Sequence, residues 1–365
     1  MTTSPTAGAV TVDLRKPDQL LAAIPHLLGF RPERSILVLA HAGDQANRIG
    51  HALRADLPPP GREHELAKVL HRPLRQEGTH AVTLAVVGNS PEERAESPPH
   101  RGLVDTVRAL LSAGGVRTMH ALWVPEIREG AAWCCYDEPG CGGTLPDPAS
   151  TVLAAVAAHA GLVTYGSRQE SARRLTPDDP AALRRRAGLL RARAAEFPAA
   201  SGVALAHGYR LVRDALRRAE CGTPSFTDGE VADLACALEL PEVRDACLAT
   251  ALPPGTPRAA TAERLWLALV RAIPAPERAQ AASLLAYSAY VRGDGALAGM
   301  AATNAREADP QHMLAGLLEQ ALHHALPPRR LAQLGQACDG AALWGSDPPG
   351  EPGTPPTPGS PPAAG

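Results

Sequence analysis

The pattern of apolar residues changes near residue 150, and this change constrains the fold more than any other feature of the sequence. Before it, short apolar runs that are typical of buried strands alternate with stretches of helical periodicity. After it, nearly all of the chain to Ala337 has helical periodicity interrupted by Pro or Gly. The 365 residues are enough for two domains of about 100 to 200 residues each. The pattern predicts an α/β domain over residues 10–165 and an all-helical domain over residues 166–340.

The first domain is expected to contain a mixed sheet with helices packed on it. Strand-like apolar runs occupy residues 35–40, 48–57, 80–87, 116–124 and 131–136. The first two strands and the last two are expected to form hairpins, because turn-forming residues separate them. Helical periodicity occupies residues 17–28, 62–76 and 103–112. Pro25 lies inside the first of these helices and is expected to kink or break it.

The second half of the chain is expected to consist of helices. Candidates cover residues 151–160, 180–196, 203–219, 228–238, 241–252 and 259–272. Thr227 with Glu230 predicts a capping box at the start of the fourth. Aromatic residues make up only 3% of the chain, so the cores must be built from Leu, Val and Ala. The last residues, 346–365, are almost all Pro, Gly, Ser, Thr and Ala and are expected to form a disordered tail.

Residues 279–312 have the spacing of one tetratricopeptide-like helical hairpin. Ala298 and Ala305 would let its two helices approach closely, and Asp309–Pro310 would end the second helix. A full second copy is missing, although stable solenoids need about three repeats. Two interpretations follow: a helical hairpin packed into a larger helical domain, or part of a peptide-binding groove.

The N-terminal sequence has no charged region leading into an apolar one, so no secretory signal is predicted. Residues 152–163 are too short and too rich in Ala to span a membrane, which takes about 20 apolar residues. The seven cysteines are an odd number, and Cys134 and Cys135 are adjacent, which is poor geometry for a disulfide framework. We therefore expect reduced thiols and a cytoplasmic protein without a membrane span.

Several segments of the chain resemble one known family. They are LLAAIPHLLGFRPERSILVLA at residues 20–40, RADLP at 54–58, CCYDEPGCGGTLPDP at 134–148 and GDGALAGMAATNAREADP at 293–310. Their order and spacing are similar to those of the actinobacterial family named domain of unknown function 4192, over roughly residues 12–328. The resemblance implies an actinobacterial source, which fits a chain with lysine only at Lys16 and Lys68. It implies no activity.

The sequence lacks the motifs of several enzyme classes. Neither lysine follows a glycine, so a phosphate-binding Gly-Lys-Ser/Thr loop is absent from the sequence. Dinucleotide-binding, nucleophile-elbow and His-Glu-x-x-His motifs are also missing. No cofactor is predicted. Cys134, Cys135 and Cys141 are weak candidates for zinc ligands or redox-sensitive thiols, but we expect ordinary cysteines and no metal.

Four charged residues border the first two predicted strands: Arg31, Arg34, Arg54 and Asp56. Strand ends often form ligand crevices in α/β sheets, and arginine suits carboxylate or phosphate. These residues are therefore a candidate ligand site. The alternative is that Asp56 caps a turn before the three prolines and that the arginines are solvated or paired with acids. The arginine-rich helix at residues 184–193 spreads its charge around the helix, so we expect a solvated helix and no nucleic-acid partner.

Two hypotheses for function follow. The first is a non-enzymatic scaffold or regulatory module that binds protein partners through its helical domain. The second is an enzyme or small-ligand binder that uses the crevice near Arg54 and Asp56. An exposed apolar groove along residues 279–326 would favour the first hypothesis. A deep polar pocket at the strand ends, with a carboxylate of perturbed pKa, would favour the second.

Overall fold

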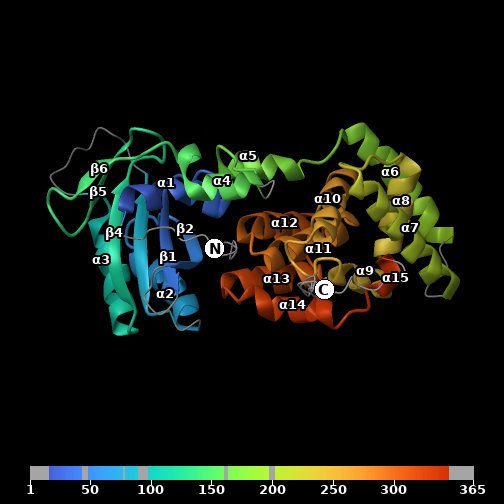
Figure 1. Cartoon of the computed structure of the whole chain (residues 1–365). Coiled ribbons are helices and arrows are strands. Elements are labelled where there is room, and N and C mark those ends of the chain that lie inside the picture. Colours follow the sequence, from blue (N-terminus) through green and yellow to red (C-terminus); the bar gives the residue numbers. More distant parts are fainter. Residues whose placement is uncertain are drawn as a thin grey trace, which may run out of the picture.

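The computed structural model describes residues 16–42, 48–76, 79–88, 98–159, 163–196 and 202–344. Its N-terminal half contains a mixed sheet with helices, and its C-terminal half is helical (Figure 1). The predicted fold class, an α/β part followed by an all-helical part, is confirmed. The predicted disordered tail at residues 346–365 lies outside the described residues.

The sheet has six strands in the order β2-β1-β3-β4-β5-β6. The strands are β1 (Ser35–Ala42), β2 (Arg48–Asp56), β3 (Ala81–Val87), β4 (Arg117–Val124), β5 (Ala132–Cys135) and β6 (Gly142–Thr144). β3 and β4 pair in parallel, and the other neighbouring strands pair antiparallel. The predicted hairpins β1–β2 and β4–β5 are confirmed. β6 was not predicted, because Gly-Gly-Thr has no apolar pattern and joins the sheet through its backbone.

Helices cover both faces of the sheet, because strand side chains point alternately to opposite faces. α1 (Pro17–Leu28) packs on one face, with Leu37 and Leu39 of β1. α2 (Glu63–Gln76) and α3 (Arg101–Ala113) pack on the other, with Ile36 and Val38. We call these the α1 face and the α2/α3 face. Strands buried on both sides explain why β3 is apolar almost throughout and has no exposed residue.

Pro25 was expected to kink or break the first helix, and it does not break it. α1 is one helix from Pro17 to Leu28 with Pro25 inside it. Pro25 lies in the last turn, where its missing N–H removes one hydrogen bond close to the helix end. Its ring is buried, as are Leu21 and Ile24 on the same helix. Burial of this apolar surface favours an unbroken helix.

The helical half contains several packed helices. Their bounds are α4 (Val152–His159), α5 (Arg168–Ala172), α6 (Pro180–Glu196), α7 (Gly202–Glu220), α8 (Asp228–Leu238), α9 (Pro241–Ala249), α10 (Pro257–Ala272), α11 (Arg278–Arg292), α12 (Gly295–Ala308), α13 (Met313–His323), α14 (Pro328–Gln336) and α15 (Ala341–Trp344). The predicted capping box of α8 is present, with Thr227 and Glu230 bonded to each other's backbone N–H. Arg218 and Thr227 donate hydrogen bonds to Glu230 and hold its pKa at about 2. Among the described residues, no helix is long and apolar enough to cross a membrane.

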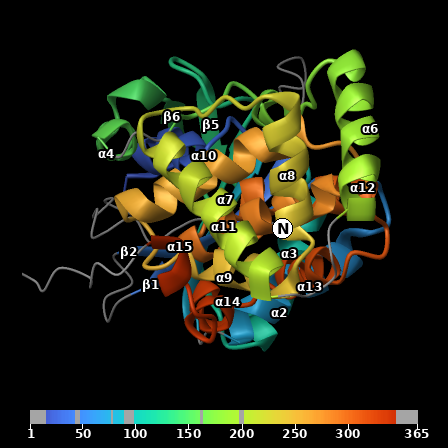
Figure 2. The ribbon, with the colours of Figure 1, turned by 90° about the vertical axis from the view of Figure 1, so that its right-hand side faces the viewer.

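α11 lies at the centre of the helical half (Figures 1 and 2). Twelve of its fifteen residues are buried, which is possible only for a helix packed on nearly every side. The Tyr287 hydroxyl donates to the Leu331 carbonyl at 3.1 Å, and the Tyr290 hydroxyl lies 3.0 Å from the Ala321 carbonyl. The first bond joins α11 to α14, and the second joins α11 to α13. The segment predicted as a tetratricopeptide-like hairpin therefore contains the central helix of this half.

α11 and α12 form a helical hairpin. The chain leaves α11 at Gly293, whose φ of 90° is a left-handed conformation that glycine adopts without strain. Asp294 then caps α12 by accepting a hydrogen bond from the Leu297 N–H at 2.9 Å. Ala298 and Ala305 are fully buried, so their small side chains permit the close approach inferred from the sequence.

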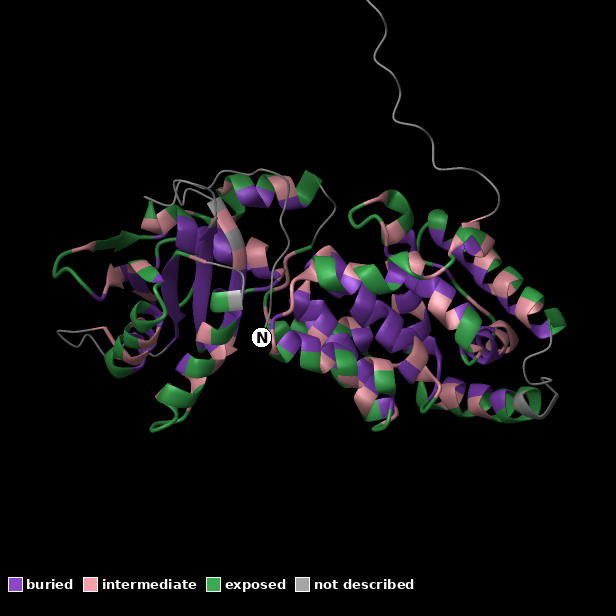
Figure 3. Ribbon diagram, turned by 90° about the horizontal axis from the view of Figure 1, so that it is seen from below, coloured by how far each residue is buried: buried purple, intermediate pink, exposed green. Residues whose placement is uncertain are grey.

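The buried cores extend across both halves of the chain (Figure 3). The cluster on the α1 face continues into the helices of the C-terminal half, from Leu20 to Leu343. Ala325, which follows α13, belongs to the cluster on the α2/α3 face. The division at residue 165 into separately folding domains stays a prediction.

The arginines of α6 were expected to be exposed to solvent, but one of them is buried. Arg186 is only 8% exposed. It donates to Asp178 at 2.9 Å, to Asp228 at 2.7 Å and to the Ala272 carbonyl at 2.9 Å. The prediction is therefore wrong for Arg186, because the helix periodicity could not reveal that acidic side chains from distant segments would meet it.

Candidate functional site

Two of the four charged residues predicted as a ligand site lie together at the edge of the sheet. Asp56 ends β2 and is paired with Ser35, the first residue of β1. Arg54 donates from Nε to Ser35 Oγ at 2.9 Å and from Nη2 to Asp56 Oδ1. The side chain of Arg54 is 10% exposed, whereas that of Asp56 is 81% exposed. The pair therefore has one buried member and one that solvent or a ligand can reach.

The surroundings of Arg54 are unusual for a cation. Its guanidinium lies over the ring of Phe30, 6.0 Å from the centroid. Burial lowers the pKa of Arg54, the charge of Asp56 raises it, and the positive charge of Arg168 on α5 lowers it again. Arg54 therefore has Asp56 as its carboxylate partner, and the positive charge of Arg168 also acts on it. Such a place favours an anion that could neutralise both arginines.

The contacts of Arg31 and Arg34 with neighbouring segments are made mainly by their backbone atoms. Both are exposed. The Arg31 N–H donates to the Tyr165 carbonyl at 2.9 Å, which ties the end of α1 to the segment before α5. Arg34 has a φ of 41°, and a side chain at Gly88 would come within 2.9 Å of its Cα atom. Glycine at position 88 is thus required for this close approach.

The cysteine candidates divide between two faces. Cys135 and Cys141 contact the apolar cluster of the α1 face. Cys134 lies between Trp133 and Cys135 on β5, so its side chain points to the opposite face. Within the described part of the chain, no group of three or more His, Cys, Asp or Glu side chains is placed to hold a metal ion. The three cysteines therefore do not converge on one point.

A second polar group, which was not predicted, lies on the α1 face. His41 of β1 is 8% exposed, and its Nε2 lies 3.0 Å from Oγ1 of the buried Thr83 on β3. His120 of β4 is paired with Thr83, so His41, Thr83 and His120 follow one another across β1, β3 and β4. Burial, together with the charges of His120 and Arg117, lowers the pKa of His41 to about 4. A histidine next to the apolar run at residues 35–40 was the available signal in the sequence.

The helical half has an exposed apolar stripe on α13. Met313 is 79% exposed and Leu317 is 55% exposed. They lie four residues apart and therefore on the same face of the helix. The opposite face of α13 is buried through Ala315, Leu318, Ala321 and Leu322. We call Met313 and Leu317 the α13 stripe. It falls within residues 279–326, the segment in which an exposed apolar groove was expected to favour partner binding.

Comparisons with known proteins give a family but no activity. No curated protein and no solved structure matches the chain. A family model described as "Domain of unknown function (DUF4192)" matches residues 17–329, which include the sheet, the Arg54–Asp56 pair, strands β5 and β6 with the three cysteines, and α13. The match agrees with the resemblance inferred from the sequence motifs. The chain therefore belongs to the family of domain of unknown function DUF4192.

Proposed function

We propose that the protein is a non-enzymatic interaction module, and that its helical half binds a protein partner through the α13 stripe. The observation that carries this proposal is the exposure of Met313 and Leu317, at 79% and 55%. The neighbouring helix α11 buries nearly all of its side chains, so apolar residues in this region are normally covered. Large exposed apolar side chains on one helix face are typical of binding sites.

The partner is expected to present apolar side chains at helical spacing. Met313 and Leu317 lie one turn apart, and methionine adapts its shape to different apolar surfaces. Arg306 and Glu319 form an ion pair at 3.5 Å between α12 and α13, so α13 carries charge on a side away from the stripe. An amphipathic helix that presents an apolar face fits this surface.

Replacing Met313 with lysine and Leu317 with glutamate is expected to reduce recovery of the partner about tenfold or more. Charged side chains placed at the centre of an apolar contact remain desolvated and unpaired. The measurement is quantitative mass spectrometry of proteins that co-purify with the full chain, compared with the unchanged protein. Folding is checked by thermal unfolding, since both positions are exposed.

The matched control changes Val152 to lysine and Val163 to glutamate. These residues are also exposed, at 66% and 63%, but lie on or beside α4. The proposal is supported if a protein co-purifies with the unchanged chain and with this control variant, but not with the variant changed at Met313 and Leu317. Co-purifying proteins that respond equally to both variants, or to neither, would contradict it.

A second candidate function is binding of a small anion next to Arg54. It is favoured by the surroundings of Arg54, because burial lowers the pKa of this arginine most and the positive charge of Arg168 lowers it further. A carboxylate or phosphate would relieve the repulsion between the cations.

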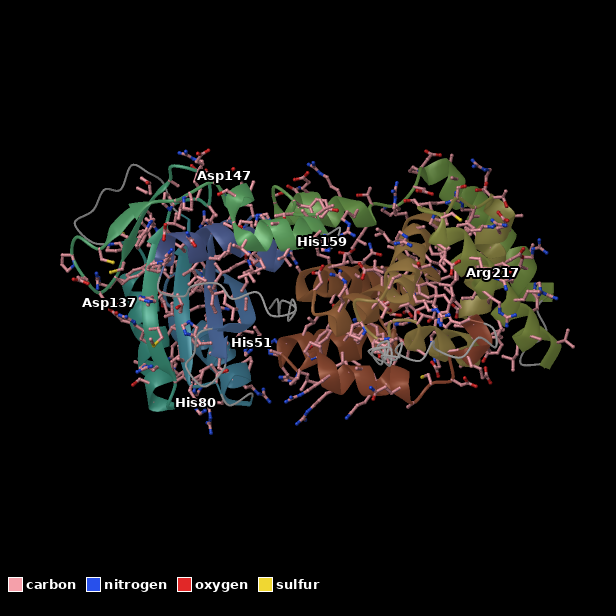
Figure 4. All side chains as sticks on the ribbon, in the orientation of Figure 1. His51, His80, Asp137, Asp147, His159 and Arg217 are labelled. Atoms are coloured by element: carbon pink, nitrogen blue, oxygen red, sulfur yellow. The ribbon has the colours of Figure 1, made fainter. Side chains whose placement is uncertain are left out.

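Inorganic phosphate is the probe for this second candidate. At equal ionic strength, replacing chloride by phosphate is expected to raise Tm by about 2 °C or more, because a ligand that binds the folded state stabilises it. An Arg168→Gln variant should lose this rise. Arg217→Gln is the control, because Arg217 is an exposed cation in the helical half, far from the sheet (Figure 4). Equal Tm values in the two salts would reject the anion site.

A further inference from the structure

The β5–β6 hairpin holds two thiols opposite each other. Cys134 is paired with Gly142 in an antiparallel register, which puts Cys135 opposite Cys141. The Cys135 N–H donates to the Cys141 carbonyl at 3.0 Å. In antiparallel strands, opposed residues that share a backbone hydrogen bond have Cα atoms about 5.5 Å apart. A disulfide needs a Cα distance of roughly 4.4–6.8 Å.

The side chains of the pair also point the same way. Both cysteines contact the apolar cluster on the α1 face, whereas the neighbouring Cys134 points to the other face. A hydrogen bond between the thiols of Cys135 and Cys141, together with burial, raises the pKa of Cys141 to about 11. Both residues are half-buried free thiols, so a small molecule can reach them.

The turn between the two strands contacts the sulfur of Cys135. Its Sγ accepts a hydrogen bond from the Glu138 N–H at 3.3 Å. The turn lies at the outer edge of the sheet, as Asp137 shows in Figure 4. Gly142 is needed next to Cys141, because a side chain there would come within 2.6 Å of the Trp133 carbonyl oxygen. The backbone is therefore fixed close to the geometry of a cross-strand bond.

We propose that Cys135 and Cys141 are a modification site that forms a reversible disulfide when the protein meets a low-molecular-weight disulfide such as glutathione disulfide. The Cys135 thiolate attacks one sulfur of the small disulfide and releases one thiolate. The Cys141 thiolate then attacks Cys135 in this mixed disulfide and releases the second. Two protein thiols lose two electrons and two protons, and one small disulfide becomes two thiols. The new bond ties β6 to β5 at the edge of the sheet.

The order of attack follows from the chemistry of the two thiols. The thiolate is the nucleophile, and a raised pKa makes Cys141 a poor first attacker. Once Cys135 carries the mixed disulfide, Cys141 is the nearest thiol across the strand. Cys141 therefore acts as the resolving thiol.

The test uses the full chain, folded, with glutathione disulfide as the oxidant. Titratable thiols, counted after unfolding, are expected to fall from the seven cysteines of the sequence to five, the two of the new bond being lost. Cleavage between Tyr136 and Asp137 should then leave two peptides joined by a bond between Cys135 and Cys141, and dithiothreitol should separate them. Amide exchange of residues 142–144 should slow in the oxidised protein.

The matched variants are Cys134→Ser, Cys135→Ser and Cys141→Ser. Cys134→Ser should still form the bond, because its side chain lies on the other face. Cys135→Ser and Cys141→Ser should each prevent it, and Cys141→Ser should stop at the mixed disulfide on Cys135. Circular dichroism establishes that each variant is folded. A bond between Cys134 and Cys135, a bond between Cys134 and Cys141, or seven unchanged thiols would overturn the proposal.

Discussion

Replacing Arg292 with methionine is expected to lower the free energy of unfolding by about 3–5 kcal/mol. Arg292 ends α11 and donates two hydrogen bonds to Glu263 of α10, at 2.9 and 3.0 Å. It also donates to Asp294, the N-cap of α12, at 3.1 Å. Burial alone lowers the pKa of Arg292, but the charges of Glu263 and Asp294 outweigh it and raise that pKa. The variant leaves two carboxylates largely buried, at 17% and 22% exposure, without their cation.

The matched control for Arg292 is Arg217→Met. Arg217 pairs with Asp214 at 3.4 Å, but their side chains are 66% and 55% exposed, so its loss should cost less than about 1 kcal/mol. Urea unfolding at neutral pH measures both changes. Adding Glu263→Leu to Arg292→Met should recover part of the loss, because one unpaired carboxylate is removed. Equal effects of Arg292→Met and Arg217→Met would show that the network does not join these helices.

Acid is expected to destabilise the protein through His41, by up to about 3 kcal/mol between pH 6.5 and pH 4. Burial, with the charges of His120 and Arg117, lowers the pKa of His41 from 6.5 to about 4 in the folded state. In this window the unfolded chain binds a proton that the folded chain does not, so stability falls as the pH falls. A difference of one in pKa between the folded and unfolded states corresponds to about 1.4 kcal/mol. Below pH 4 both states are protonated and the loss stops growing.

A His41→Gln variant should remove this pH-dependent loss, and glutamine can still bond to Thr83. The measurement is the difference in unfolding free energy between variant and unchanged protein at pH 7, 5.5 and 4. Burial also lowers the pKa of His26, His71 and His312, but these act in both proteins and cancel in the difference. His64→Gln is the control at an exposed position. Parallel pH curves for His41→Gln and the unchanged protein would contradict the prediction.

Element types were predictable from the sequence because periodicity is a local property of the backbone. The buried strands at residues 35–40 and 80–87 were recognised by continuous apolar runs. The capping box at Thr227 and Glu230 was recognised by a spacing of three residues. Family membership could also be inferred, because the order and spacing of the motifs are properties of the sequence itself.

The arrangement of the candidate sites was only partly predictable. Arg54 and Asp56 were identified because they lie two residues apart on one strand. The nearness of Arg168, which lies more than a hundred positions later, could not be inferred from any local pattern. The exposure of Met313 and Leu317 could not be predicted either, because these residues have the same apolar spacing as the buried face of α13.

The sequence by itself determined which segments are strands and helices and where the apolar pattern changes. Only the tertiary structure decided which side chains meet. The three cysteines look alike in the sequence, yet strand register sets Cys135 against Cys141 and turns Cys134 away. Arg186 has the same charge as its neighbours on α6, yet it alone among them is buried, against Asp178 and Asp228. Local periodicity depends on neighbouring residues, whereas these contacts depend on how distant segments pack together.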